Sequence, residues 1–230
     1  MARDARLIEA ATHGRVLVRG AIAGKAAGLV VGFHGYMENA AIQMERLEAI
    51  PGAERWTLVS VQGLHRFYRG RSDHVVASWM TREDREVAIA DNLAYVDRAI
   101  ASIPEAGRPR IVYAGFSQGA AMAFRSGTRG RFGAAGIVSV GGDVPPELIA
   151  GAVTFPPILL ARGRDDEWYT EQKLDADLAA MASLGADVSP LVYAAGHEWD
   201  AEVSQAAGGF IAACLSVDAA PRLPRSNGTR

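Results

Sequence analysis

The chain has a single cysteine, Cys214, among 230 residues. One cysteine cannot form a disulfide within the chain, and such scarcity is typical of proteins from a reducing compartment. No run approaches the roughly 20 consecutive apolar residues that a membrane-spanning helix needs. The opening residues "MARDARLIEA" lack the apolar core of a secretory signal. These absences predict a cytoplasmic enzyme or binding protein.

The sequence also lacks a strong excess of charge of either sign. Lys and Arg number 24 against 26 Asp and Glu, which leaves a formal net charge of −2. Proteins that attract nucleic acid or an acidic membrane surface carry clustered positive charge, so we expect no nucleic-acid partner and no membrane span. No two of the five histidines have the spacing of zinc ligands. We therefore expect no metal ion and no other cofactor.

The content of the chain is that of an ordinary globular protein. Its 230 residues suit one domain with a sizeable core, and 49% hydrophobic and 22% charged residues are typical values. We see no internal repeat. We expect one domain over residues 1–219 and a disordered tail over residues 220–230, which are polar and contain prolines.

Short apolar runs alternate with longer stretches of helical character. The runs lie at 15–20, 27–35, 56–63, 110–117, 134–142, 156–163 and 189–196, and the helical stretches at 39–50, 82–103, 118–127, 170–185 and 200–217. Most runs show no alternation of polar and apolar residues, as expected for strands covered on both faces. The sequence therefore predicts an α/β fold with a mostly parallel central sheet and helices on both faces.

Two finer expectations concern pairing and burial. The strand at 15–20 is expected to pair with residues 6–14 or with the next run along the chain. The helix over 82–103 is expected to present one apolar stripe to the core, made of Val87, Ala90, Ala94, Val96 and Ile100.

One predicted strand ends in "GFSQG", in which Gly115 and Gly119 flank Ser117. The pattern Gly-x-Ser-x-Gly is weak by itself, because a loop in a chain with 25 glycines can match it by chance. Here a strand precedes the serine and a helix of small residues follows, which is the setting of a nucleophile elbow. Glycine removes the Cβ atoms that would collide at so tight a turn. We therefore interpret Ser117 as a catalytic nucleophile.

A serine hydroxyl needs a base that takes its proton and a carboxylate that orients the base. Behind a nucleophile elbow these partners follow in the chain order serine, acid, histidine. Only His197 among the five histidines follows Ser117, and it comes just after the last predicted strand, in "YAAGHEW". The alternative is a histidine of a surface loop, but the chain order favours His197 as the base.

The acid has several candidates. A carboxylate that orients the imidazole should follow the strand at 156–163, where "GRDDEW" offers Asp165, Asp166 and Glu167. Asp143, after the preceding strand, is a fourth candidate. Neighbouring aspartates on an extended loop point in different directions, so only one of them can serve.

An acyl-transfer site also needs hydrogen-bond donors for the developing oxyanion. One is the N–H of Gln118, the residue after the nucleophile. The second should come from the loop after the strand at 27–35, where "HGYMEN" places the N–H of Tyr36. His34 precedes the serine in the chain, so we interpret it as a hydrogen-bonding residue that shapes this loop.

Together these residues resemble the α/β-hydrolase superfamily and, within it, the phospholipase/carboxylesterase branch, which includes acyl-protein thioesterases and small bacterial carboxylesterases. The matching segments, within about residues 28–200, are "FHGYMEN", "SW" at 78–79, "GFSQGAAMA", "ARGRDDEWY" and "YAAGHEW". The branch carries Gly-x-x-Asp in its acid loop, so the resemblance implies a single-domain α/β-hydrolase fold with Asp166 as the acid. It also implies that Tyr36 and Gln118 supply the oxyanion N–H groups.

Two positions depart from the branch. Its loop usually reads His-Gly-x-Gly, whereas Met37 stands at the second glycine here. If that position needs a positive φ, the loop differs in shape or carries strain. The Val-Pro that usually follows the acid is Glu167-Trp168 in this chain, which alters the edge of the site.

The stretch 62–86 is the most individual part of the chain. It lies where the branch builds part of its acyl pocket, and five of its side chains are candidates for the wall of an apolar cleft: His65, Phe67, Tyr68, Trp79 and Met80. Arg66, Arg69 and Arg71 could receive an anionic group. The alternative is a packed surface loop with solvated arginines.

These features predict a cofactor-free serine hydrolase that cleaves carboxylic esters or thioesters of small to medium acyl chains through an acyl-enzyme. A lactone hydrolase of the dienelactone type and an acyltransferase are alternatives on the same fold. A non-catalytic ligand-binding homologue is disfavoured, because serine, acid and histidine are all present. The expected partner is a small-molecule ester or thioester.

Overall fold

The computed structural model describes residues 5–22, 26–104, 110–151 and 153–216. The tail at 220–230, expected to be disordered, lies outside the described residues. None of the helices within the described ranges is both long and apolar enough to cross a membrane.

Seven strands form the central sheet, in the order β1-β3-β2-β6-β7-β8-β9. Their bounds are β1 Arg15–Arg19, β2 Leu29–Phe33, β3 Thr57–Gln62, β6 Ile111–Phe116, β7 Gly136–Val140, β8 Ile158–Gly163 and β9 Val188–Tyr193. All neighbours except β1 and β3 are parallel. After β2 the chain adds β3 on one side of β2, and later it adds β6 to β9 on the other side. The strand order therefore reverses between β2 and β6, and open α/β sheets bind their ligands at such a point.

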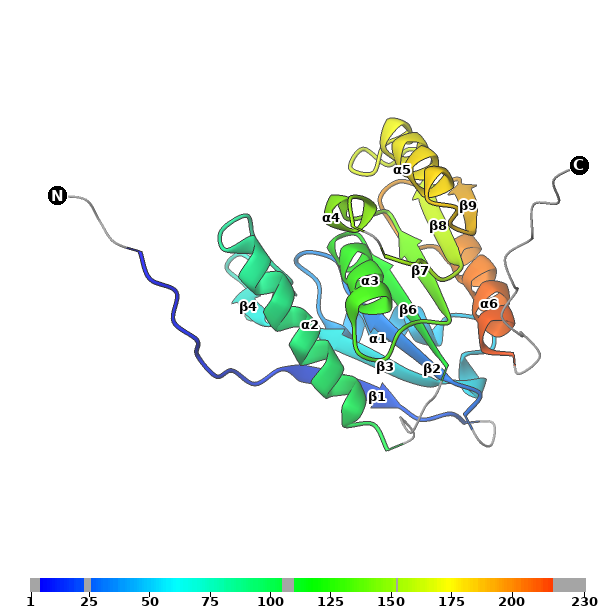
Figure 1. Ribbon diagram of the computed structural model, residues 1–230. Coiled ribbons are helices and arrows are strands. Elements are labelled where there is room, and N and C mark those ends of the chain that lie inside the picture. The colour runs from blue at the N-terminus through cyan, green and yellow to red at the C-terminus, as the bar shows by residue number, and fades with distance from the viewer. Residues whose placement is uncertain (1–4, 23–25, 105–109, 152, 217–230) are drawn as a thin grey trace, which may run out of the picture.

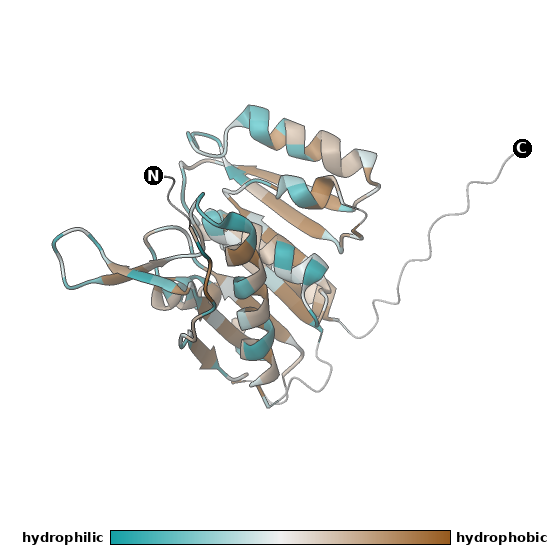
Figure 2. Ribbon diagram, turned by 60° about the vertical axis from the view of Figure 1, so that its left-hand side comes forward, coloured by the Kyte–Doolittle hydropathy of each residue, from teal (hydrophilic) through white to brown (hydrophobic). Residues whose placement is uncertain are grey.

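The predicted α/β architecture is confirmed, and helices cover both faces of the sheet (Figure 1). Helices α2 (Arg85–Ala101), α3 (Gln118–Arg129), α4 (Pro146–Ile149) and α5 (Glu171–Ser183) pack on one face, and α1 (Ala40–Glu48) and α6 (Ala201–Leu215) on the other. A short 3₁₀ helix, η1, spans Ala53–Arg55. Figure 2 shows the strands of the central sheet as mostly hydrophobic, while hydrophilic residues lie on the helices and the loops. β2, β3, β6, β7 and β8 are buried along their whole length, which explains their unbroken apolar runs.

The pairing expected for the first strand is wrong. β1 pairs antiparallel with β3, with Val16 opposite Val61, and neither with residues 6–14 nor with β2. β2 already has β3 and β6 on its two sides, so the edge of β3 is the place left for β1. The other edge strand, β9, is only partly buried.

The burial stripe expected for the long helix is also wrong in part. Val87, Ala90 and Ala94 are exposed, while the core side of α2 carries Ile89, Asn92, Tyr95, Val96, Ala99 and Ile100. The large side chains decide which side packs, because Ile89 and Tyr95 bury far more apolar area than the alanines.

The stretch 62–86 contains a hairpin that the sequence analysis did not anticipate. β4 (His65–Tyr68) and β5 (Val75–Ser78) pair antiparallel and form a second, two-stranded sheet. Gly70, with a φ of 60°, lies in the loop between them. The hairpin carries the chain back to Trp79 and Met80, next to the carboxyl ends of β2 and β6.

Candidate active site

Ser117 lies in the turn between β6 and α3, with a φ of 53° and a ψ of −119°. A non-glycine residue rarely adopts a positive φ, and strained residues of this kind concentrate at functional sites. A Cβ atom at Gly115 would collide with the carbonyl group of Gly119, and one at Gly119 with the carbonyl oxygen of Phe33. The two glycines therefore permit the tight turn, as the sequence analysis expected.

A chain of hydrogen bonds joins Ser117, His197 and Asp166. His197 Nε2 lies 2.8 Å from Ser117 Oγ, and Nδ1 lies 2.8 Å from Asp166 Oδ2. A carboxylate only accepts hydrogen bonds, so it holds the imidazole proton on Nδ1 and leaves Nε2 free to accept the proton of the serine hydroxyl. The structure thus brings the three predicted residues together in the order that a serine nucleophile needs.

Among the four acid candidates, Asp166 is the one that contacts the imidazole. Its Oδ1 accepts the backbone N–H groups of Trp168 and Tyr169, and its side chain is fully buried. Asp165 and Glu167 are exposed. Asp143 is exposed too, and its carboxylate faces Lys173 at 3.4 Å.

The loop after β2 carries the proposed oxyanion donor Tyr36, and His34 shapes it. His34 is fully buried; its Nε2 accepts the N–H of Gly63 at 3.0 Å, so Nδ1 carries the proton and donates to Gly35 O at 2.7 Å. Burial lowers the pKa of His34, which favours this neutral form. Met37 has a φ of 61°, so the loop retains a left-handed residue without the glycine that usually stands there.

Glu38 supports the same loop, a role that the sequence analysis missed. Its Oε2 accepts the N–H of Gly35 at 2.7 Å, and its two oxygens accept both Nη groups of Arg46 at 2.6 Å. The guanidinium of Arg46 lies 4.3 Å over the ring of Phe116, and that ring lies 5.0 Å from the His197 ring. The sequence signal that could have indicated this role is an acidic residue four positions after His34.

Trp79 and Gln118 join the hairpin segment to the turn that carries Ser117. Trp79 Nε1 donates to the carbonyl oxygen of His34 at 2.9 Å. The side-chain oxygen of Gln118 accepts the N–H of Trp79 at 2.9 Å, and its Nε2 donates to Met80 O at 2.9 Å. The side chain of Gln118 thus ties α3 to this segment, while its N–H begins the helix and has no acceptor within it.

A cavity of about 350 Å³ opens beside Ser117. It is lined by Met80, Arg85, Ser117, Gln118, Ala121, Arg125, Gly141, Gly142, Asp143, Val144, Pro145, Pro146, Trp168, Tyr169, Lys173 and His197.

Of the five pocket candidates, Met80 alone lines this cavity. Trp79 is fully buried in the core, where its ring contacts Phe33 and His34. The other three lie on β4, where His65 and Tyr68 are exposed and Phe67 packs beside Tyr36 with ring centroids 5.9 Å apart. The arginines considered for an anionic group, Arg66, Arg69 and Arg71, are exposed on the hairpin and do not line the cavity.

Three other cations line the cavity, and the sequence analysis missed them: Arg85, Arg125 and Lys173. Arg125 is one of two arginines in α3, and it follows Gln118 by seven positions, so it shares a helix face with the start of the helix. A charged residue at that spacing was the signal that could have identified it.

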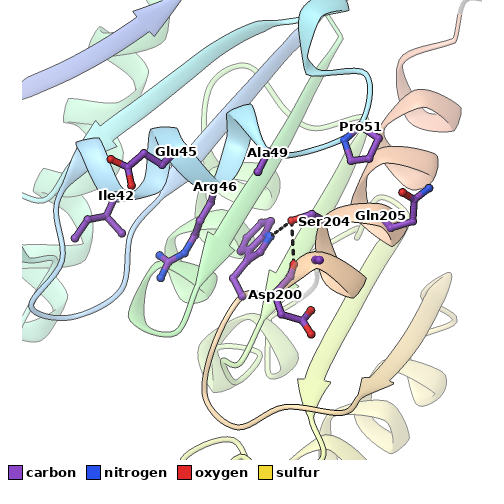
Figure 3. A pocket seen from close by; sticks show the side chains of 10 residues that line it. Ile42, Glu45, Arg46, Ala49, Pro51, Asp200, Ser204 and Gln205 are labelled. Carbon is purple, nitrogen blue, oxygen red and sulfur yellow. Dashed lines mark hydrogen bonds between the residues drawn. The ribbon is translucent and has the colours of Figure 1, made fainter.

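A larger cavity, of about 580 Å³, lies between α1 and α6 and is lined by none of the three hydrogen-bonded residues (Figure 3). On one side of it Trp199 Nε1 donates to Ser204 Oγ, which donates to Asp200 O. Asp200 also accepts the N–H of Val203 at the start of α6. These bonds fix the chain just after His197 to the first turn of α6.

Comparisons with known proteins identify the family of the chain. A family model described as Phospholipase/Carboxylesterase matches residues 23–215. No curated protein sequence matches the chain.

Several solved structures share the fold. Esterase PE8 is 22% identical, with a TM-score of 0.70 over 87% of this chain and 98% of that one. Acyl-protein thioesterase 2 of Zea mays is 19% identical, with a TM-score of 0.69 over 89% of this chain and 100% of that one. A carboxylesterase of Bacillus cereus is 16% identical, with a TM-score of 0.67 over 87% and 94%.

Proposed function

The chain belongs to the phospholipase/carboxylesterase family, and from that membership we propose that it is a serine hydrolase that cleaves carboxylic esters or thioesters of small to medium acyl chains. The branch expected from the sequence is thereby confirmed, and the protein is an enzyme of the carboxylesterase type. The observation that carries the finer proposal is the hydrogen-bonded series of Ser117, His197 and Asp166, with both distances at 2.8 Å.

In the proposed reaction, Ser117 Oγ attacks the substrate carbonyl carbon while His197 Nε2 takes the hydroxyl proton. The buried carboxylate of Asp166 holds the ring in the required tautomer and stabilises the imidazolium that forms. The leaving group departs with the proton from His197. Water then enters and attacks the acyl carbon while His197 takes its proton. The bond from the acyl carbon to Ser117 Oγ breaks, His197 returns the proton to Oγ, and the acid leaves.

Negative charge develops on the carbonyl oxygen in both steps. We assign its stabilisation to the backbone N–H groups of Tyr36 and Gln118, which begin the loop after β2 and the helix after β6. Preorganised donors of this kind are worth about 10²–10³ in kcat each. The bonds of His34 and Glu38 to the loop at Gly35 support this preorganisation.

The size of the cavity supports small or medium acyl groups. Its volume of about 350 Å³ lies at the low end of the roughly 300–1,000 Å³ of ligand sites. Met80, Ala121 and Val144 provide apolar wall.

The test combines active-site labelling with a substrate panel. A serine-directed fluorophosphonate should label the wild-type protein once, and the label should disappear in Ser117→Ala but remain in the control Ser183→Ala on the exposed side of α5. Wild type should hydrolyse p-nitrophenyl esters or acyl thioesters, with lactones included in the panel, and Ser117→Ala should not. Labelling that persists in Ser117→Ala contradicts the proposal.

A further inference from the structure

One face of α3 leads from the nucleophile into the cavity. Gln118, Ala121 and Arg125 all line the cavity, and their spacing of three and four residues places them on the same side of the helix. Arg125 follows Ser117 by eight residues, or about 12 Å along the axis. Helical side chains lean toward the N-terminus, so the guanidinium lies nearer to Ser117 than its Cα atom does.

The guanidinium of Arg125 is buried, and only part of its hydrogen-bonding capacity is used. The residue is 1% exposed. Its Nε donates to Glu147 Oε1 at 2.8 Å, and Nη1 contacts Met80 Sδ at 3.7 Å. A thioether is a weak acceptor. Among the described residues, no oxygen accepts a hydrogen bond from either Nη of Arg125.

The charges around Arg125 do not balance. Glu147 is shared, since its Oε2 also lies 3.5 Å from Nη2 of Arg85. Both arginines line the cavity. Two guanidinium groups therefore share the single carboxylate of Glu147, which leaves one positive charge without a matching negative charge. At the cavity edge, Lys173 and Asp143 form a separate, exposed pair. Burial lowers the pKa of Arg125 while the bond to Glu147 opposes that effect.

We propose that Arg125, assisted by Arg85, binds a carboxylate of the substrate, so that the enzyme prefers short esters or thioesters that carry a carboxylate near the scissile bond. The inference rests on the proposed function. A planar carboxylate can accept from both Nη groups of one guanidinium. A neutral chain in the same place leaves buried charged donors without an acceptor, which is costly. The separation of about 12 Å along α3 between Ser117 and Arg125 limits the length of such a substrate.

The test compares substrates matched in carbon number. Ethyl hydrogen glutarate is paired with ethyl pentanoate, which places the carboxylate on the acyl side. The acetate ester of 3-hydroxypropanoate is paired with propyl acetate, which places it on the leaving-group side. Values of kcat/KM come from titration of the released acid. We expect the carboxylated member of at least one pair to be favoured about tenfold or more by the wild type.

The main variant leaves the net charge of the cavity as it is in the wild type. The pair Arg125→Met with Glu147→Gln removes both partners of this ion pair together, so that no carboxylate is left without its partner. It should lower the preference strongly, although Arg85 remains at the cavity. Arg125→Lys, which retains the charge without the planar fork, should retain part of it. The control Arg131→Met removes an exposed arginine just beyond α3 and should leave the preference ratio as in the wild type.

Two results overturn the inference while the proposed function stands: a wild type that favours the neutral ester in both pairs, or a double variant that keeps the wild-type ratio. If the wild type hydrolyses none of the esters and fluorophosphonate does not label Ser117, the proposed function is contradicted, and the inference falls with it.

Discussion

The carboxylate of Glu38 accepts the backbone N–H of Gly35 at 2.7 Å, one residue before the proposed oxyanion donor Tyr36. Arg46 holds the same carboxylate through two bonds at 2.6 Å. The orientation of the peptide groups in this loop therefore depends on an ion pair between the loop and α1.

We expect Glu38→Gln and Arg46→Met each to lower kcat about tenfold to a hundredfold, with a smaller effect on KM. Displacement of the Tyr36 N–H weakens the stabilisation of the transition state more than it weakens substrate binding. The measurement is steady-state kinetics on a short neutral ester. Glu45→Gln, on an exposed position of the same helix, is the control and should behave as wild type. An unchanged kcat in both test variants would show that the loop keeps its shape without the ion pair.

Glu38 should also contribute to acid sensitivity. Burial raises the pKa of Glu38, but the hydrogen bond and charge of Arg46 and the Gly35 N–H outweigh this, so its pKa lies below the ordinary value. A carboxyl group with a lowered pKa in the folded state stabilises the fold fully above its unfolded pKa, and this contribution is lost as the pH falls through the folded pKa. Wild type should therefore exceed Glu38→Gln in free energy of unfolding at pH 7 by more than at about pH 3. Urea titrations of both proteins at several pH values test this. A difference in free energy of unfolding that stays the same from pH 7 to about pH 3 contradicts it.

The acid should be Asp166. We expect Asp166→Asn to lose up to about 10⁴ in kcat, as carboxylate removal does in serine proteases, because the amide no longer holds the imidazole tautomer. Asp165→Asn, at the exposed neighbouring position, is the matched control, and Glu167→Gln and Asp143→Asn extend it. Circular dichroism checks that each variant folds. If Asp165→Asn is the crippled variant, the assignment is off by one residue.

The protein should be more stable with glycine at position 37 than with alanine there. At a φ of 61° a Cβ atom costs about 1–2 kcal/mol, so Met37→Gly should exceed Met37→Ala in free energy of unfolding by about 1 kcal/mol. The reverse order is expected at Ala90 on the exposed side of α2, where Ala90→Gly should lose about 1 kcal/mol. Chemical unfolding measures both. A Met37→Ala variant as stable as Met37→Gly would indicate that the loop relaxes out of the left-handed region.

Chain-length preference should respond to Met80 and not to Trp79. Met80→Ala enlarges the cavity and should move the preferred acyl chain of p-nitrophenyl esters to greater length. Trp79→Phe removes a buried indole and its bond to His34, so it should lower the melting temperature, with a free-energy loss of about 1–3 kcal/mol, and leave the chain-length order as in the wild type. A shifted order in Trp79→Phe would return that residue to the substrate site.

The interior of the sheet could be predicted because strands buried on both faces leave unbroken apolar runs, as in Leu29–Phe33 and Ile111–Phe116. The pairing at the sheet edge could not be predicted. β1 and β3 are separated by about 40 residues of sequence, and the five residues of β1 do not encode which strand they pair with. In α2, alanines at helical spacing suggested a stripe that Tyr95 and Ile89 override.

Chain order and turn chemistry were enough to predict Ser117 and His197, which lie 2.8 Å apart in the structure, since the turn demands small residues at fixed positions. Spacing within a related family was needed to choose Asp166. The support from Glu38 and Arg46, the cations of the cavity and the burial of Trp79 depend on contacts between segments distant in the chain, which local pattern does not encode.

Gly119 bears on how this enzyme can change. A methyl group there would collide with the backbone at Phe33, so α3, which follows Ser117, and β2, which precedes the proposed oxyanion loop, are in direct backbone contact. A library aimed at new substrates should therefore leave residues 32–38 and 113–120 untouched and randomise Asp143, Trp168 and Lys173, which line the cavity outside these two segments. Selectivity can then be varied there without loss of the reaction itself.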